Sequence, residues 1–397
     1  MTTLMQDRPA ESRAESVPPA PTRRRLLSLD ALRGATIAAM VLVNDPATGP
    51  PYLYHQLTHS PWDGWTFADT IFPAFLFMVG VSMAFSLPRH GDRRGVWARI
   101  ARRVVLLFAL GLLVNGFPLL LGGGGSVLGH LRIMGVLQRI ALAYLIAAAA
   151  VLLLRVEAQV VLVAALLIGY WALLTWVPVP GHGRHMLTPS GSLAAWVDRT
   201  VLGSAHMYGG GRPGYDPEGL LGSLPAAAGV LIGHWAGLLL RSRVGERVKV
   251  AAMVVSGLLL LAVGEGWSHA LPINKRMWTS SFVALMSGWS VLALALCHLL
   301  FDHDTRPARW ISAPLRVLGA NAILIYVGSE LSAAALAHYH HLANGDPSAP
   351  IPFWIWHDHL APHFGPSGGA LVYACALLGA WWLVLAVLHR LGWYLRV

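Results

Sequence analysis

Long runs of apolar residues, separated by shorter polar or aromatic stretches, dominate the sequence. A helix needs about 20 mainly apolar residues to cross a bilayer, and lipid cannot satisfy free backbone groups, so each run is predicted to be a membrane-spanning helix. The runs lie near residues 26–44, 66–87, 96–121, 131–154, 159–177, 220–240, 248–267, 277–301, 315–337 and 369–388. The pattern therefore predicts an all-α polytopic membrane protein, a bundle of about ten transmembrane helices.

The composition supports a membrane protein. Only 12% of the residues are charged and 55% are hydrophobic, whereas a soluble domain carries about 25% charged residues. This argues against a water-soluble enzyme. The excess of 29 Lys and Arg over 19 Asp and Glu is better explained by membrane topology than by nucleic-acid binding in so apolar a chain. No nucleic-acid partner is expected.

The basic residues also predict the orientation. Roughly three quarters of them fall in the N-terminal segment and in the alternate connections that share its side. The positive-inside rule then predicts that the N and C termini are both cytoplasmic. Residues 1–25 are rich in Pro, Ser, Glu and Arg and are predicted to be a disordered cytoplasmic tail, followed by a transmembrane domain over residues 26–397.

Three long connections lie on the opposite side of the predicted bundle. They are the segments 45–65, 178–219 and 338–368. Connections of this length tend to be functional or disordered, and their many Trp, His, Pro and Gly residues favour ordered, functional loops. The closely spaced histidines of the third segment are His338, His340, His341, His357 and His359. No cysteine or carboxylate cluster completes a metal site around them, so we predict no metal.

Polar residues inside the spans are costly in lipid unless they face a partner or a cavity. Those predicted in the outer half are Asn44, Asp69, Asn115, Gln138, Arg139, Glu265 and Glu330, while Asn321 and His234 lie deeper. Each could make an interhelical hydrogen bond, which is ordinary in large bundles. As a set gathered toward one side, they favour a polar cavity that opens to the outside.

The most specific patterns begin near the N-terminus. They are SLDALRG (28–34), Asn44, HSPWDGWTFAD (59–69) and IFPAFLFMVG (71–80), followed by RIMGVLQR (132–139), YDPEG (215–219), PINK (272–275) and Asn321. Through these motifs the chain resembles the heparan-α-glucosaminide N-acetyltransferase family, a branch of the transmembrane acyltransferases. The LDALRG motif is shared by several membrane acyltransferase groups, whereas the block over residues 59–73 is much more specific.

This resemblance implies a function. It implies transfer of an acetyl group from cytoplasmic acetyl-CoA to an amino sugar or other glycan acceptor outside, with the catalytic histidine at His59 and the essential asparagine at Asn44. It is compatible with a homodimer. The short tail and the Arg-rich composition favour a bacterial plasma (inner) membrane protein, so heparan sulfate itself is not the expected acceptor.

The chemistry of the residues agrees with that implication. A histidine that titrates near neutrality can act as general base toward the acceptor amine, or can carry the acyl group itself, and this is the role expected of His59. The side-chain amide of Asn44 can donate hydrogen bonds to a developing oxyanion. Asp69 can orient an imidazole or bind a sugar hydroxyl.

Substrate binding is predicted from the remaining motif residues. The candidates are Trp62, Arg132, Gln138, Arg139, Asp216, Glu218, Asn274, Lys275 and Asn321. Coenzyme A phosphates need arginines or helix N-termini as donors. The cations predicted nearest to the chemistry are Arg132, Arg139, Lys275 and Arg276. The rival set is cytoplasmic and comprises Arg93, Arg94, Arg99, Arg102 and Arg103.

Two other functions remain open from the sequence. A secondary transporter of a small polar solute would use the same intramembrane polar groups, and Pro73 is predicted to interrupt the second helix as in many transporters. The sequence shows no convincing internal repeat, which disfavours this alternative. A non-catalytic membrane scaffold would not need a polar lining beneath long aromatic loops.

Overall fold

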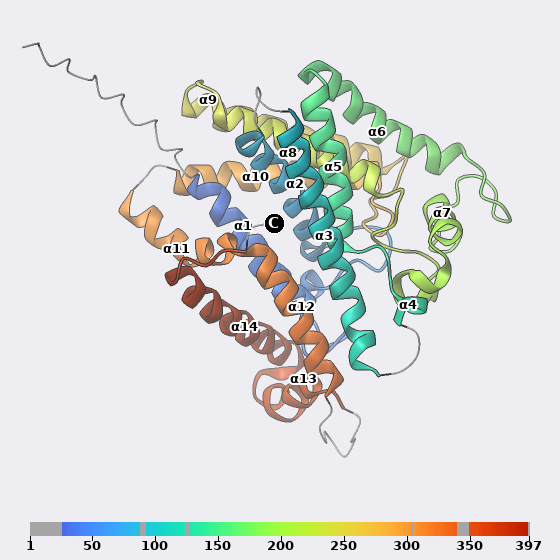
Figure 1. The fold of residues 1–397 in the computed structure, drawn as a ribbon, viewed down its shortest axis with the longest axis vertical. Helices are drawn as coiled ribbons and strands as arrows, with labels where there is room; N and C mark the ends of the chain where they lie inside the picture. The colour runs from blue at the N-terminus through green and yellow to red at the C-terminus, as the bar shows by residue number, and fades with distance from the viewer. Residues whose placement is uncertain (1–25, 88–92, 124–126, 303–304, 340–348, 396–397) are drawn as a thin grey trace, which may run out of the picture.

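The computed structural model describes residues 26–87, 93–123, 127–302, 305–339 and 349–395 (Figure 1). Over these residues the chain folds into helices joined by loops, with two isolated β-bridges and no strand. The predicted all-α fold class is confirmed. The predicted tail over residues 1–25 lies outside the described residues, as do His340 and His341.

Within the described ranges, nine helices are long and apolar enough to cross a membrane, and a bent pair makes a tenth. The first eight are α1 (Leu27–Asn44), α2 (Phe67–Ser86), α3 (Arg93–Leu121), α5 (Val136–Leu153), α6 (Val156–Trp176), α8 (Ser223–Arg241), α9 (Glu246–Ser268) and α10 (Ser280–Phe301). The ninth joins α13 (Ile351–Trp354), a π-helical turn (Ile355–Leu360) and α14 (Ala361–Arg390). The prediction of about ten apolar helices is confirmed.

The run predicted over residues 315–337 is not one straight helix. It divides into α11 (Arg306–Ala320) and α12 (Ala322–His338), which are bent by 66° about Asn321. The φ and ψ angles of Asn321 are −125° and 38°, outside the helical region. Its side chain donates to the carbonyl oxygen of Trp393 and accepts from the N–H of Leu395, so the break is stabilised by the end of the chain.

The prediction of a loop over residues 338–368 is also partly wrong. Helical structure already begins at Ile351, where Pro352 occupies the first turn, a position that a proline tolerates because the N–H there has no intrahelical partner. Gly365, with a φ of 72°, kinks the helix near the start of α14. The pattern of apolar runs does not predict these turns, because three histidines and two prolines lie between residues 357 and 366.

The short elements are α4 (Val127–His130), α7 (Leu193–Val201) and the 3-10 turns His55–Leu57, Ser204–His206 and Tyr208–Gly211. All of them lie in connections between spanning helices. The segment 178–219 is therefore an ordered loop, as its composition predicts. A small apolar cluster that includes Tyr170, Leu174 and Leu193 holds α7 against the end of α6.

Polar contacts group the helix ends into two sides. At the N-terminal end of α1, the Ser28 hydroxyl donates to Asp302, just beyond α10, at 2.6 Å. His298 in α10 pairs with Glu246, the first residue of α9, and Arg241 at the end of α8 donates to the Ala84 carbonyl near the end of α2. We call this the Ser28 side. The opposite ends form the His59 side, and this alternation agrees with ten antiparallel spans.

Glycines let α2 and α8 pack with their backbones in close contact. A Cβ atom on Gly80 would lie 1.8 Å from the carbonyl oxygen of Val230, and one on Gly233 would lie 2.0 Å from that of Phe77. Small residues at such crossings are typical of membrane helix pairs. The helix α2 also continues through Pro73, so the predicted interruption there is wrong. The loop that carries His59 leads into α2, the first helix of this closely packed pair.

Candidate active site

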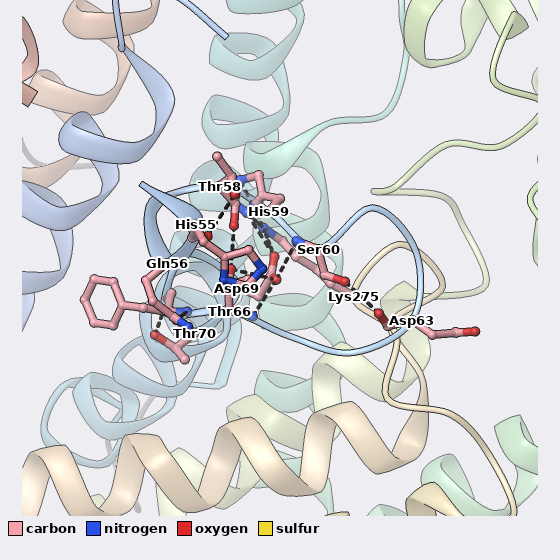
Figure 2. Close-up of polar contacts among 11 residues, drawn as sticks. His55, Gln56, Thr58, His59, Ser60, Asp63, Thr66, Asp69, Thr70 and Lys275 are labelled. Atoms are coloured by element: carbon pink, nitrogen blue, oxygen red, sulfur yellow. Dashed lines mark hydrogen bonds and ion pairs between the residues drawn. The ribbon is translucent and has the colours of Figure 1, made fainter. Parts of the chain in front are cut away.

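The start of α2 holds a buried carboxylate beneath His59 (Figure 2). Thr66 caps the helix, and Asp69, three residues later, accepts hydrogen bonds from the backbone N–H groups of Thr66 and Ser60, each 3.0 Å long. Both bonds end on the Oδ2 atom. A threonine followed three residues later by an acidic side chain is the capping-box arrangement. The local sequence therefore fixes Asp69, which is fully buried, and leaves its Oδ1 atom for another donor.

Asp69, His59 and Lys275 form one compact cluster (Figure 2). The Nδ1 atom of His59 lies 2.9 Å from the Oδ1 atom of Asp69. The Nζ atom of Lys275 lies 3.3 Å from the same oxygen, 3.0 Å from Nδ1 of His59 and 3.3 Å from its Nε2 atom. The carboxylate thus binds the imidazole and the ammonium together.

This geometry favours a neutral His59 with its proton on Nδ1. An ionised carboxylate accepts the Nδ1–H bond, which leaves the lone pair on Nε2. Burial lowers the pKa of His59 below its ordinary value and the Lys275 ammonium lowers it further, although Asp69 opposes both. Burial also lowers the pKa of Lys275 to about 8, against the attraction of Asp69.

The loop that carries Lys275 is fixed by its neighbour Asn274. The Asn274 side chain is fully buried, donates to Oδ1 of Asp63 at 3.0 Å and accepts from the N–H of Met277 at 2.8 Å. Asp63 belongs to the same loop as His59. Asn274 therefore ties the two loops together, which places the Lys275 ammonium beside the imidazole.

His59 lines a cavity of about 200 Å³, which we call the His59 cavity. Asn44, Glu218 and Lys275 also line it, while most of the other lining side chains are apolar. Asn44 is the last residue of α1, and its amide donates to Oε1 of Glu330 at 3.1 Å. His59 and Asn44, two of the three residues predicted to be catalytic, therefore line one cavity.

Arg132 is held by two carboxylates. Its guanidinium donates two hydrogen bonds to Asp216, of 2.6 and 3.0 Å, and one of 2.5 Å to Glu218, and it lies 4.9 Å from the centre of the Tyr208 ring. Burial opposes ionisation of Glu218, but Arg132 holds the pKa of that carboxyl below its ordinary value. The positive charge of Arg132 is thus already compensated by protein groups.

Gln138 and Arg139 lie in the wall behind the His59 cavity. On α5, Leu137 and Ile140 line the cavity, whereas Gln138 and Arg139 do not. The Arg139 guanidinium packs 4.6 Å from the centre of the Trp278 ring and donates to one backbone carbonyl. Both residues are almost completely buried. Their placement fits a packing role around the cavity.

Trp62 and Asn321 lie outside the His59 cavity. The indole N–H of Trp62 donates to the Leu187 carbonyl at 2.8 Å, and its ring meets Tyr215 edge-on, so Trp62 anchors the His59 loop to the segment 178–219. Asn321 lies at the break between α11 and α12, where its side chain binds the end of the chain on the Ser28 side.

A second cavity, of about 220 Å³, lies between the His59 cavity and the Ser28 side, and we call it the Arg33 cavity. Arg33, Ser82 and Arg103 line it, and Arg33 donates to the Ser82 hydroxyl at 2.8 Å. The side chains that line both cavities are Phe75, Leu137, Ile140 and Ile323. These four apolar side chains, which we call the apolar waist, therefore lie between the two cavities. Arg33 is not among the predicted site residues, although a charge inside the apolar LDALRG run is the signal that could have revealed it.

The structure thus gathers part of the predicted set. The predicted residues at or directly behind the His59 cavity are His59, Asn44, Asp69, Glu218 and Lys275. Those that support its walls and loops are Trp62, Arg132, Gln138, Arg139, Asp216 and Asn274. Across the described part of the chain, no group of three His, Cys, Asp or Glu side chains could hold a metal ion.

Comparison with known proteins bears on this site. The family described as heparan-alpha-glucosaminide N-acetyltransferase, catalytic, matches residues 25–194. The predicted resemblance is confirmed. Two relatives bear the name heparan-alpha-glucosaminide N-acetyltransferase: the human protein is 29% identical over 378 residues, and the mouse protein is 28% identical over 364 residues. These matches cover 81% and 77% of this chain but 54% and 53% of the relatives, so the chain spans about half their length.

The family match over residues 25–194 contains Asn44, His59 and Asp69 but ends before Glu218 and Lys275. The structure brings the two parts together, because Lys275 contacts His59 although the two lie 216 residues apart. The site is therefore assembled from the matched segment and from loops beyond it.

Proposed function

We propose that this chain is an acetyltransferase that moves an acetyl group from acetyl-CoA to the amine of a sugar or other glycan acceptor. The observation that carries the proposal is the His59 imidazole, held neutral by burial and by Lys275, bound through Nδ1 to Asp69 and facing a cavity. The names of the human and mouse relatives support an acetyl donor and an amine acceptor.

The Nε2 lone pair of His59 can serve acetyl transfer in two ways. It can accept the proton of the acceptor amine while the amine nitrogen attacks the thioester carbon and the C–S bond breaks. Alternatively, Nε2 attacks the thioester carbon itself, the thiolate leaves, and the amine then takes the acetyl group from the imidazole. Both routes need the same neutral tautomer, which the bond to Asp69 supports.

Asn44 and Lys275 are the donors nearest to the reacting carbonyl in this proposal. Both line the same cavity as His59, and each carries N–H groups that can stabilise the oxyanion of a tetrahedral intermediate. Asn44 donates to Glu330 in the structure, so one of its two N–H groups is engaged and the other remains for the substrate.

The two cavities support a path for the coenzyme through the bundle. The thioester end of acetyl-CoA would lie in the His59 cavity, and its arm would pass the apolar waist. Its phosphates would lie toward the Ser28 side, where Arg33 and Arg103 line the Arg33 cavity. Arg103 belongs to the rival set of phosphate ligands, whereas Arg132 already binds two carboxylates. The basic residues of the Ser28 side favour the cytoplasm as the side of entry.

The transporter alternative receives less support. A polar solute would have to pass the waist, which is made by Phe75, Leu137, Ile140 and Ile323 and offers no polar side chain. In acetyl transfer no whole polar molecule has to cross, because only the acetyl group leaves the coenzyme and the rest of the coenzyme returns to the side from which it entered.

A paired substitution tests the proposal in purified protein. His59→Ala should reduce turnover of radiolabelled acetyl-CoA with an amino-sugar panel by about a thousandfold or more, because the base or carrier is lost. His55→Ala is the control, since His55 is an exposed histidine in the same loop. Near-normal turnover by a folded His59→Ala protein would contradict the proposal.

A further inference from the structure

A third cavity opens beside α2, on the face turned away from the His59 cavity, and we call it the lateral groove. Its volume is about 430 Å³, roughly twice that of the His59 cavity. It is lined by small side chains of three helices, including Ala39 of α1, Ala74 of α2 and Ala293 of α10, and these helices contact one another in pairs. Small residues on all three helices leave the space open.

The lateral groove is built for an apolar occupant. None of its described lining residues carries a charge. Its three hydroxyl groups are already engaged, because Thr36, Thr70 and Ser290 each donate to a backbone carbonyl of their own helix at 2.7 to 2.8 Å. No lining hydroxyl therefore remains as a donor for a polar solute, and hydrocarbon is the chemistry that fits.

Exposed aromatic side chains frame the groove. Trp65, Phe67 and Trp289 line it and are 36%, 47% and 42% exposed, and the rings of Trp65 and Trp289 lie 5.9 Å apart. Tryptophans are enriched at the headgroup level of a membrane. From Phe67 to Ala74 the groove follows α2 for about 10 Å, which is within the depth of one leaflet.

The groove and the active site share a wall. Ile71 of α2 lines both the lateral groove and the His59 cavity. Trp65, at the groove, and His59, at the cavity, belong to the short loop that leads into α2. A molecule with its chain in the groove and a polar head at the His59 side would bring that head to the loop that carries both Trp65 and His59.

We propose that the lateral groove binds the hydrocarbon chain of the acceptor, so that the acceptor is the amine-bearing sugar headgroup of a membrane lipid. This inference rests on the proposed acetyl transfer and names its substrate class. Anchoring the chain beside α2 raises the effective concentration of the amine at His59, in the way that a second attachment point does for any tethered ligand. Water-soluble amino sugars lack this attachment and react at higher concentrations.

Two acceptors with one headgroup test the substrate class. Methyl and dodecyl β-glucosaminide present the same amine, and the full chain in lipid nanodiscs is assayed with both. Ala74→Phe fills the groove, and Ala109→Phe is the control, because Ala109 is exposed on α3 and lines none of the cavities described. Wild type and control should favour the dodecyl acceptor by about tenfold or more in kcat/KM. Ala74→Phe should lose most of this preference while its kcat/KM for the methyl acceptor is unchanged.

A binding measurement separates this inference from the acetyl transfer on which it rests. A dodecyl glucosaminide with a photoreactive group in its chain should label peptides of α1, α2 or α10 at the groove, and an excess of unmodified dodecyl glucosaminide should suppress the labelling. Labelling without acetylation would contradict the proposed function and leave the groove assignment intact. An equal chain preference in Ala74→Phe and Ala109→Phe, or labelling that Ala74→Phe does not reduce, would overturn the groove assignment.

Discussion

Besides burial, two neighbouring residues influence the protonation of the His59 imidazole, Asp69 by a hydrogen bond and Lys275 by its charge. Asp69 fixes the ring and its proton by a 2.9 Å hydrogen bond to Nδ1. Lys275 lies within 3.3 Å of both ring nitrogens and adds a positive charge that disfavours protonation. A general base near a cation keeps its lone pair at lower pH than it would alone. The pair therefore sets the orientation of the ring and favours its neutral form.

The pH dependence of the reaction follows from this pair. Burial and the Lys275 charge both lower the pKa of His59 from its ordinary 6.5, and the neutral form is the active one, so activity is lost as the pH falls through that pKa. Lys275→Met removes one lowering cause, so the pKa rises and the acid limb of kcat/KM should move to higher pH. Arg184→Met, at an exposed residue, should leave the limb in place. An unmoved limb in Lys275→Met would contradict the assigned electrostatics.

At the scale of elements, the close pair of α2 and α8 sets where the site lies. The apolar runs predict both helices, but they do not predict that Gly80 and Gly233 let the two backbones touch. The sequence likewise does not predict the bend at Asn321, because the residues that its side chain binds, Trp393 and Leu395, lie more than 70 residues away. Hydropathy reports burial in lipid, whereas such contacts depend on which helices become neighbours.

The glycine contacts predict a stability difference. In Gly233→Ala the new methyl group would lie 2.0 Å from the Phe77 carbonyl oxygen, which forces the helices apart and should cost about 1–3 kcal/mol. Gly169→Ala in α6 meets no atom within 4 Å and should be neutral or stabilising by up to about 1 kcal/mol. Thermal unfolding in detergent measures both. Equal melting temperatures for the two variants would contradict the observed packing.

At the scale of the whole molecule, two cavities separated by an apolar waist lie between the His59 side and the Ser28 side. The sequence motifs predicted that His59, Asn44 and Asp69 belong together, because they lie close in the chain around the start of one helix. They could not predict that Lys275 contacts His59, since loops 216 residues apart meet only after the bundle forms. For the same reason the sequence predicts Arg132 as a phosphate ligand, whereas in the folded chain its guanidinium binds the carboxylates of Asp216 and Glu218.

The Arg33 cavity predicts which arginine binds the coenzyme. Arg103→Gln should raise the dissociation constant of coenzyme A by about tenfold, the effect of losing roughly 1.4 kcal/mol of charge-assisted binding. Arg102→Gln is the matched control, because Arg102 is the exposed neighbour and does not line the cavity. Equilibrium binding of coenzyme A to the purified protein checks both variants. Equal dissociation constants for the two would remove Arg103 from the proposed path.

The central claim is that His59 passes an acetyl group between the two sides of the membrane, and vectorial transfer in proteoliposomes tests it most directly. Acetyl-CoA is trapped inside the vesicles and a membrane-impermeant amino sugar is added outside. We expect acetylated sugar outside with wild-type protein and with His55→Ala, none with His59→Ala, and none when acetyl-CoA and sugar are both confined to the Ser28 side. Product formed with both reactants on the Ser28 side, or formed at the wild-type rate by His59→Ala, would contradict the account.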